Sequence, residues 1–245
     1  MRTAAYTRFE LVRTFRSRRF FVFSLGFPLV LYFLIATPNR HVTDFAGSGL
    51  SAPLYYMTGL ITFGTMAAML SSGARIAGER EAGWNRQLRL TPLSSAAYFR
   101  AKVTTAYAMA GATIVLLYLS ATVLGVRLAA GRWVEMTILL IVGLIPFAAL
   151  GVFVGHLLTV DSIGPLVGGL VGLLAFVSGT WFPIGSHGVW HAIAQFLPSY
   201  WLVQAAHVGA GGHAWSALGW ATIAAWTIVL TVLAGVAYRR DTNRV

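Results

Sequence analysis

The sequence predicts an all-α integral membrane protein with six transmembrane helices. Hydrophobic residues make up 57% of its 245 residues and charged residues only 10%, which is too little charge to cover the surface of a soluble domain. The apolar residues occur in runs of about 18 or more with almost no charge, the length that crosses a bilayer as a helix. Cysteine is absent, which excludes disulfides, thiolate catalysis and Cys-ligated metal ions.

The apolar runs divide a single domain, residues 1–245, into spans and connecting segments. The six spans are expected at residues 20–37, 54–74, 103–125, 136–158, 165–182 and 217–238. The remaining segments are expected to be an interfacial helix at 1–19, a cytoplasmic elbow at 75–102 and a re-entrant hairpin at 183–216.

The first two elements are expected to be a membrane-surface helix and a retained span. Apolar residues such as Phe9 and Val12 are interleaved with arginines in the first segment, which is typical of a helix on a membrane surface. The apolar run that begins at Phe20 has the basic flank of a signal peptide. Pro38 and Arg40 follow it in place of a small-residue cleavage site, so we expect this run to remain as an anchor.

Two features distinguish the last third of the chain. Gly164, Gly168 and Gly172 recur every four residues in the fifth span, which predicts a helix face that packs closely against another helix. The segment after this span contains Trp190 and Trp201, and its apolar stretch is too short and too interrupted to cross the bilayer. We therefore expect that segment to be re-entrant or interfacial.

Arginine and lysine are distributed unevenly between the two sides of the spans. The first segment, the loop after the second span and the tail together contain fifteen of them, against three in the alternate loops. Because cytoplasmic loops carry the excess of Arg and Lys, both termini and the elbow are expected in the cytoplasm. The arginines form no continuous stripe with stacking aromatics, which argues against nucleic acid as a partner.

The sequence indicates that the energy for any transport comes from another protein. No Asp, Glu, Lys or Arg falls inside an expected span, whereas ion-coupled transporters usually keep such residues there. The only lysine, Lys102, lies in FRAKVTT with no glycine before it, so a phosphate-binding loop is absent. We expect this chain to have no catalytic residues and no cofactor of its own, so any ATPase, with its ATP and Mg²⁺, must be a separate partner.

The elbow has an unusual concentration of charge for so apolar a chain. Seven charged residues lie in GEREAGWNRQLRLTPLSSAAYFRAK, residues 78–102. The Thr-Pro pair at 91–92 disfavours helix, and the serines that follow can cap a new one, which predicts a helix–turn–helix. A solvated loop would account for the arginines. Glu79, Glu81 and Trp84 favour instead a surface that docks a partner.

Two passages resemble the permeases of type-2 ATP-binding-cassette (ABC) exporters. GERE…RLTPLSSAAYFRAK is similar to the cytoplasmic elbow of that family, and SGTWFPIG…FLPSYWLVQAAH is similar to its fifth span and following hairpin. The resemblance implies a permease subunit in a bacterial plasma (inner) membrane that pairs with a second permease subunit, identical or homologous. It also implies that the pair binds an ABC ATPase and exports a lipophilic drug, a lipid or a glycoconjugate. Trp84 and Arg86 depart from the family pattern.

Two groups of residues are expected to carry this function. The residues expected to couple to the ATPase are Glu79, Arg80, Glu81, Gly83, Trp84, Arg86, Leu88, Thr91 and Pro92. The residues expected to form the pathway or a re-entrant gate are Tyr55, Tyr56, Phe63, Met66, Phe182, Pro183, Pro198 and Tyr200. Those in the second span could equally face membrane lipid, and the sequence does not decide between the two.

Three other functions are weaker alternatives. The charge-free spans oppose an ion-coupled secondary transporter, the lack of a Ser/His or Asp/Asp pair within them opposes an intramembrane enzyme, and the elbow opposes a structural scaffold. His187 and His191 have the spacing of metal ligands on a helix, but position 188 is glycine and not the glutamate of a metalloprotease motif. We therefore expect interfacial histidines and no metal site.

Overall fold

The protein is a bundle of α-helices. The computed structural model describes residues 3–17, 25–84, 87, 93–185, 188–212 and 214–243, and none of these residues is in a β-strand. The helices of these ranges are α1 (Thr3–Arg16), α3 (Phe27–Ala36), α4 (Ala52–Glu81), α6 (Ser95–Val123), α7 (Ala130–Gly143), α8 (Ile145–Leu157), α9 (Val160–Val177), α10 (Val189–Gln195), α11 (Pro198–Val208) and α12 (Ala217–Asn243). The predicted all-α class is confirmed.

Five helical stretches in the described part of the chain are long and apolar enough to cross a membrane. They are Ala52–Glu81, Ala96–Val123, Ala130–Leu157, Val160–Val177 and Ala217–Arg240, and they correspond to the second to sixth expected spans. α3 has only ten residues, and residues 18–24 before it lie outside the described ranges. The first expected span, and with it the count of six, therefore stays a prediction.

The fourth expected span consists of two helices in succession. α7 ends at Gly143 and α8 begins at Ile145, with Leu144 as the residue between them. Pro146 lies in the first turn of α8, where the missing N–H of proline needs no helical partner. The proline therefore starts a second helix inside an apolar run whose composition predicts a single continuous helix.

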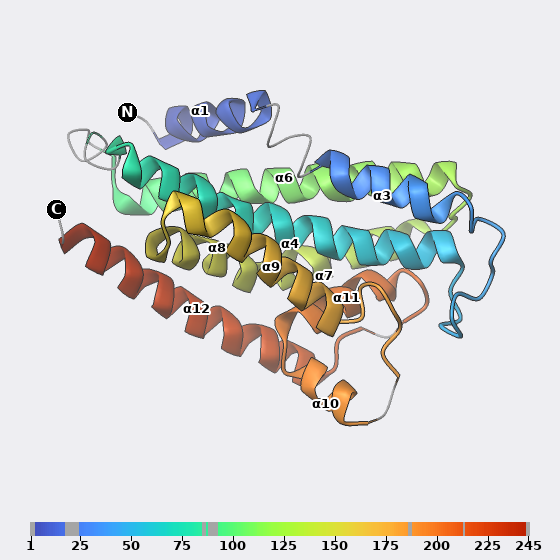
Figure 1. The fold of residues 1–245 in the computed structure, drawn as a ribbon. Helices are drawn as coiled ribbons and strands as arrows, with labels where there is room; N and C mark the ends of the chain where they lie inside the picture. The colour runs from blue at the N-terminus through green and yellow to red at the C-terminus, as the bar shows by residue number, and fades with distance from the viewer. Residues whose placement is uncertain are drawn as a thin grey trace.

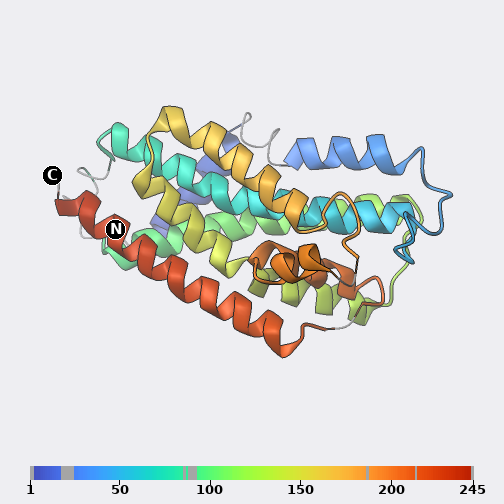
Figure 2. The ribbon, with the colours of Figure 1, turned by 60° about the horizontal axis from the view of Figure 1, so that its bottom comes forward.

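α4 lies at the centre of the bundle. It packs against α3, α6, α8, α9 and α11, which surround it in Figures 1 and 2. Its crossing with α8 is close because glycines meet there. A Cβ on Gly73 would lie 2.3 Å from the Gly151 carbonyl oxygen, and a Cβ on Gly151 would lie 2.5 Å from that of Met69. Side chains at these two positions would force the helices apart, so the glycines set the distance between them.

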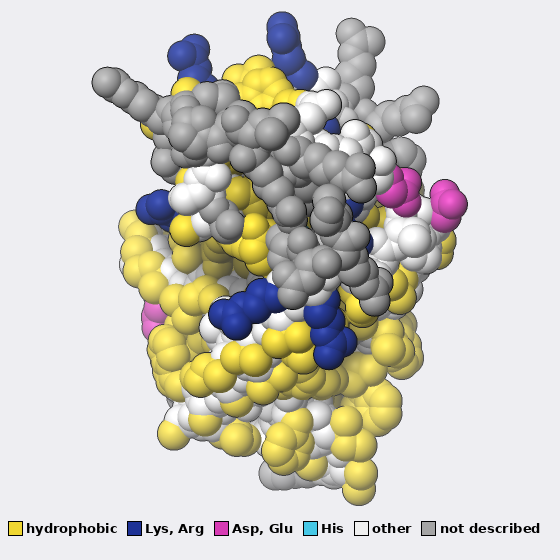
Figure 3. All heavy atoms as spheres, turned by 90° about the vertical axis from the view of Figure 1, so that its left-hand side faces the viewer, with side chains coloured by type: hydrophobic (Ala, Val, Ile, Leu, Met, Phe, Trp, Pro, Cys, Tyr) yellow, Lys and Arg dark blue, Asp and Glu magenta, His cyan; other side chains and the backbone are white. Residues whose placement is uncertain are grey.

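The two ends of the bundle differ in their side chains. Figure 1 places both termini, the last turn of α4 and the first turn of α6 at one end, which we name the charged end. Figure 3 looks onto this end and shows Lys and Arg side chains across the face, with acidic side chains near its margins. The opposite end, which we name the aromatic end, carries the α3–α4 connection, α10 and α11.

The expected re-entrant segment, 183–216, contains two short helices. α10 has seven residues and α11 has eleven, so neither is long enough to span a bilayer. α11 is buried against α4 and α7. The indole of Trp201 donates to the Gln195 carbonyl at 2.8 Å, and that of Trp215 donates to the Trp201 carbonyl at 2.9 Å. These bonds hold the segment together, and its depth in the membrane stays a prediction.

Candidate functional site

Three helices bring oppositely charged side chains together inside the charged end. Glu10 comes from α1, Glu79 from α4 and Lys102 from α6, and all three side chains are at most 2% exposed. The Lys102 Nζ lies 2.8 Å from Glu10 Oε2 and 2.5 Å from Glu79 Oε1. Charges buried away from water are costly unless they are paired. A single lysine therefore pairs with both carboxylates and links the three helices.

Further polar groups complete this arrangement. The Arg13 Nη1 lies 2.9 Å from Glu79 Oε1, and its side chain is half exposed. The Arg75 guanidinium donates to the Thr14 hydroxyl. The Tyr98 hydroxyl donates to Glu79 Oε2 at 3.2 Å. We name the five acidic and basic residues of this arrangement the charge cluster; they are Glu10, Arg13, Arg75, Glu79 and Lys102.

Helical spacing places the cluster residues on the faces that meet. Arg75 and Glu79 are four residues apart on α4, so both point to the same side of that helix. Tyr98 and Lys102 are likewise four apart on α6, and the Lys102 Nζ lies 5.2 Å from the centre of the Tyr98 ring. α4 and α6 thus each contribute polar groups from two successive turns.

α1 turns a row of polar residues inward and leaves both apolar residues and arginines exposed. Tyr6, Glu10 and Thr14 lie one turn apart and are buried, whereas Phe9 and Val12 are 48% and 46% exposed. Burial, followed by the neighbouring Glu10 carboxylate, raises the pKa of Tyr6 above its ordinary value. Exposed apolar residues beside exposed arginines are typical of a helix at a membrane surface, and that position of α1 stays a prediction.

The structure places Glu79 inside the chain, and its expected role in coupling to the ATPase stays a prediction. Its side chain is buried and binds Arg13, Tyr98 and Lys102 of the same chain, so it does not face a partner protein. Glu81 is only two residues away, but residues at this spacing point to different sides of a helix. Glu81 is exposed, which leaves it as the acidic residue of the elbow that can meet a partner.

Two elbow residues hold the connection between α8 and α9. The Arg80 guanidinium donates to the carbonyl oxygens of Gly155 and Leu158 at 3.1 and 3.2 Å, at the end of α8. The Glu81 carboxylate accepts a hydrogen bond from the Val160 amide at 3.0 Å, at the start of α9. A cation at a helix C-terminus and an anion at a helix N-terminus both complement the helix dipole. The end of α4 is therefore fastened to α8 and α9 as well as to α1 and α6.

The other expected coupling residues are described in part. Gly83 has a φ of 68°, in the left-handed region that favours glycine, and follows the end of α4. The side chain of Trp84 is partly buried. The remaining four lie outside the described residues; they are Arg86, Leu88, Thr91 and Pro92.

Three of the eight expected pathway residues line one pocket at the aromatic end. Tyr55, Pro183 and Tyr200 border a space of ≈ 710 Å³ together with Gln204 and His207. The Tyr55 hydroxyl donates to the Gly179 carbonyl at 2.9 Å, which fixes one wall of the pocket. Burial lowers the pKa of His207 to about 4, so the ring next to Tyr55 is neutral at neutral pH.

The other five pathway candidates do not line this pocket. Met66 is fully buried in the core, and Phe182 is 66% exposed. The ring of Phe63 lies 5.6 Å from that of Trp181, measured between centroids. The two remaining candidates have separate surroundings: Tyr56 stacks on Phe45, and Pro198 begins α11. The expected set therefore divides into a pocket group and scattered packing residues.

The histidines of the aromatic end make no metal site within the described ranges. No group of three or more His, Asp or Glu residues that could hold a metal ion is found there. His191 forms a hydrogen bond with the Gln195 side chain at 2.9 Å, and His187 lies outside the described residues.

Sequence reasoning missed the roles of Glu10 and Lys102, although both had a signal. Lys102 is the only lysine of the chain, and it lies directly before an expected span. Glu10 is the only acidic residue before Asp44 and sits among arginines. A single acid and a single lysine at the margins of apolar runs are candidates for a buried pair.

Comparison with known proteins identifies the class to which this helical bundle belongs. The chain belongs to the family described as ABC-2 type transporter, which matches residues 2–209. The match covers the charge cluster, the elbow and most of the pocket at the aromatic end. Membership in this family makes the chain a multi-pass membrane protein and a transport permease of an ABC transporter, which works with an ATPase partner.

A curated relative gives a similar result. The chain is 27% identical over 206 residues to the Bacillus subtilis (strain 168) protein named "Putative transport permease YvfS". The similarity covers 82% of this chain and 80% of that protein, so the two resemble each other over most of their lengths.

Proposed function

We propose that this chain is the transmembrane subunit of an ATP-driven exporter in a bacterial plasma membrane, with its charged end in the cytoplasm against an ABC ATPase. The observation that carries the proposal is the charge cluster, which ties α1 to the ends of α4 and α6. The fifteen-to-three distribution of Arg and Lys supports the orientation, because both termini lie at the charged end. The chain binds no nucleotide itself, and the partner holds ATP and Mg²⁺.

The coupling surface is the α4–α6 connection together with the exposed side of Glu81. Glu81, Gly83, Trp84 and residues 86–92 contact the ATPase, whereas Glu79 acts inside the chain. When the ATPase subunits close on ATP, they displace this connection. Because Lys102 joins α4 and α6 to α1, the three helices move together as one arm of a two-state switch.

The movement reaches the aromatic end through α4. Glu79 and Tyr55 lie on this one helix, 24 residues apart, which is about 36 Å at the rise of an α-helix. The pocket bordered by Tyr55, Pro183 and Tyr200 is the outer gate. A lipophilic drug, a lipid or a glycoconjugate leaves through it, and short outer connections favour the smaller of these cargoes.

A second permease subunit, identical or homologous, pairs with this chain through α9. A Cβ on Gly164, Gly168 or Gly172 would meet no atom of this chain within 4 Å, so the close packing expected of this stripe is not made internally. A helix from a second subunit can approach such a face closely. Membrane lipid covers the remaining apolar surface.

The proposal is tested by purifying the tagged permease from its native membrane and identifying the proteins recovered with it. An ABC ATPase should be recovered, and ATP turnover by that ATPase should rise when the permease is added. Vanadate should stop export in vesicles, and collapse of ion gradients should not. Export that stops with the gradients and continues with vanadate would establish the ion-coupled alternative.

A further inference from the structure

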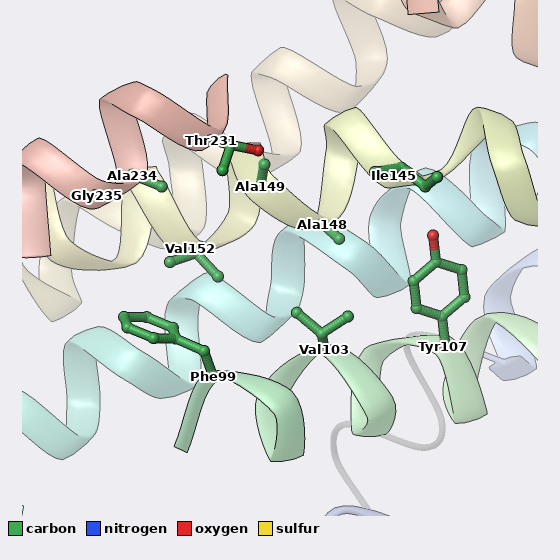
Figure 4. Close-up of a pocket in the computed structure, with 10 residues that line it drawn as sticks. All are labelled: Phe99, Val103, Tyr107, Ile145, Ala148, Ala149, Val152, Thr231, Ala234 and Gly235. Carbon is green, nitrogen blue, oxygen red and sulfur yellow. The ribbon is translucent and has the colours of Figure 1, made fainter. Parts of the chain in front are cut away.

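An apolar groove lies between α6, α8 and α12 (Figure 4). Its volume is ≈ 470 Å³, within the range of small-molecule sites. Figure 4 shows Phe99, Val103 and Tyr107 along α6, facing Ala148 and Val152 of α8. α12 completes the opposite wall with small residues, and these leave the space unfilled. This groove is separate from both the charge cluster and the pocket at the aromatic end.

The groove has the depth of one leaflet of a bilayer. Phe99 lies four residues into α6, close to the charged end, and Tyr107 lies eight residues further along the same helix. Eight residues correspond to about 12 Å of helix, and half of the hydrocarbon core of a bilayer is about 15 Å thick. Ile145 and Gly235 are exposed at its edges, so the groove opens to the surface that faces lipid.

The end of the groove nearest the charged end has an aromatic and basic border. The Phe99 and Tyr238 rings are 4.8 Å apart, measured between centroids, and Tyr238 follows the groove-lining face of α12 by one turn. Arg100 and Arg239 are the next residues along the two helices, and both are exposed; the Arg100 Nε donates to the Ala96 carbonyl of its own helix at 3.3 Å. Tyrosine and arginine are typical of the level of lipid headgroups.

We infer that this groove binds a phospholipid from the leaflet at the charged end, with one acyl chain between α6, α8 and α12. The anionic headgroup lies beside Arg100 and Arg239. An apolar space of leaflet depth matches an acyl chain, and two exposed arginines beside its border residues in the sequence match a phosphate. A water-soluble ligand would have to cross the headgroup layer to reach so apolar a space. The inference requires only that the chain spans a membrane, so it does not rest on the partner ATPase.

The experiment uses the full-length permease in nanodiscs that contain phosphatidylglycerol with a photoreactive group in its acyl chain. After illumination, the labelled peptides are identified by mass spectrometry. Labelling should concentrate on peptides of α6, α8 and α12 that line the groove. Labelling spread evenly over the lipid-facing helices would overturn the inference.

One variant fills the groove without disturbing the helices. Gly235 lines the groove, and a Cβ there meets no atom within 4 Å, so Gly235→Leu adds a bulky side chain at the groove without a clash. Labelling of the groove peptides should fall by about tenfold, since overfilling a space costs 1–3 kcal/mol. Gly111→Leu is the matched control, because Gly111 also meets no atom within 4 Å and does not line the groove. Equal labelling of the two variants would overturn the inference.

The arginines are tested by a second lipid. Arg100→Gln with Arg239→Gln should lower phosphatidylglycerol labelling by about fivefold for each arginine lost. A phosphatidylcholine probe should label the unaltered protein less than the phosphatidylglycerol probe does. The two arginine substitutions should change labelling by phosphatidylcholine little. Equal labelling by the two probes in the unaltered protein would overturn the assignment of an anionic headgroup. Circular dichroism and size-exclusion profiles identical to those of the unaltered protein establish that the variants are folded.

Discussion

The two ends of this bundle are held together by different kinds of interaction. At the charged end, a buried lysine pairs with carboxylates from two other helices. At the aromatic end, Tyr55, Trp201 and Trp215 donate hydrogen bonds to backbone carbonyls, and their rings pack on neighbouring rings. Buried ionic groups depend strongly on their partners, whereas neutral contacts are individually weak. We therefore expect the charged end to move as a unit and the aromatic end to rearrange contact by contact.

Loss of the bridging lysine should have the largest effect on stability. Lys102→Met leaves the Glu10 and Glu79 carboxylates buried without their ammonium partner, and such a loss typically costs about 3–5 kcal/mol. At about 2–4 °C per kcal/mol, the midpoint of thermal unfolding in detergent should fall by roughly 10 °C.

Two further variants show whether the stranded charges are the cause. Arg100→Met removes an exposed charge two residues earlier on α6 and should change the midpoint by no more than an ordinary surface substitution. Lys102→Met combined with Glu10→Gln and Glu79→Gln removes the stranded carboxylates and should recover part of the loss. An unchanged midpoint for Lys102→Met alone would contradict the assigned role of the cluster.

The two ends also differ in what their tightly packed glycines contact. A Cβ on Gly73 would lie 2.3 Å from the Gly151 carbonyl oxygen in α8, and a Cβ on Gly59 would lie 2.4 Å from the Thr180 carbonyl oxygen in a connection. A connection can shift more easily than a packed helix. Gly73→Ala should therefore cost about 1–3 kcal/mol, and Gly59→Ala should cost less.

The same thermal measurement compares the two glycine variants. Gly111→Ala is the control, because a Cβ there meets no atom of the chain within 4 Å, and it should leave the unfolding midpoint unchanged or slightly raised. A larger loss for Gly59→Ala than for Gly73→Ala would show that the aromatic end is the more rigid one.

Two tyrosine hydroxyls provide a smaller and more direct comparison. Tyr98→Phe removes a hydrogen bond to the Glu79 carboxylate, and Tyr55→Phe removes one to the Gly179 carbonyl. Hydrogen bonds to charged groups contribute about 1.5–3 kcal/mol and neutral ones about 1 kcal/mol. Tyr98→Phe should lower the unfolding midpoint more than Tyr55→Phe, and equal losses would mean that the charge of Glu79 adds nothing to its bond with Tyr98.

The difference between the two ends also explains what the sequence could predict. Spans at α4, α6, α9 and α12 follow from apolar runs, because burial in lipid depends on composition and length alone. Pro146 marks the division between α7 and α8, but the uninterrupted apolar run around it conceals the break.

The meeting of Glu10, Glu79 and Lys102 could not be predicted in the same way. These residues are far apart in the sequence, and their contact depends on how α1 is placed against α4 and α6. Charge pattern alone put Glu79 and Glu81 on one docking surface, since both are acidic residues of the elbow. Helical geometry points them to different sides, and only packing shows which side is the interior.

The smallest effect on stability is expected for Glu81→Arg, which should instead weaken binding of the ATPase. Asp44 is its counterpart at the aromatic end: both are exposed carboxylates that accept one backbone hydrogen bond, from Val160 and Gly49 respectively. Glu81→Arg and Asp44→Arg should therefore each lower stability by about 1 kcal/mol or less.

The two variants should differ in binding. If the charged end docks the ATPase, only Glu81→Arg should reduce recovery of the ATPase in pull-down from detergent. The expected reduction is about thirtyfold, typical for loss of an interface hot spot near 2 kcal/mol. Glu81→Gln keeps the acceptor for the Val160 amide and should give an intermediate recovery. Equal recovery with Glu81→Arg and Asp44→Arg would remove Glu81 from the interface, and reduced recovery with Asp44→Arg alone would place the ATPase at the aromatic end.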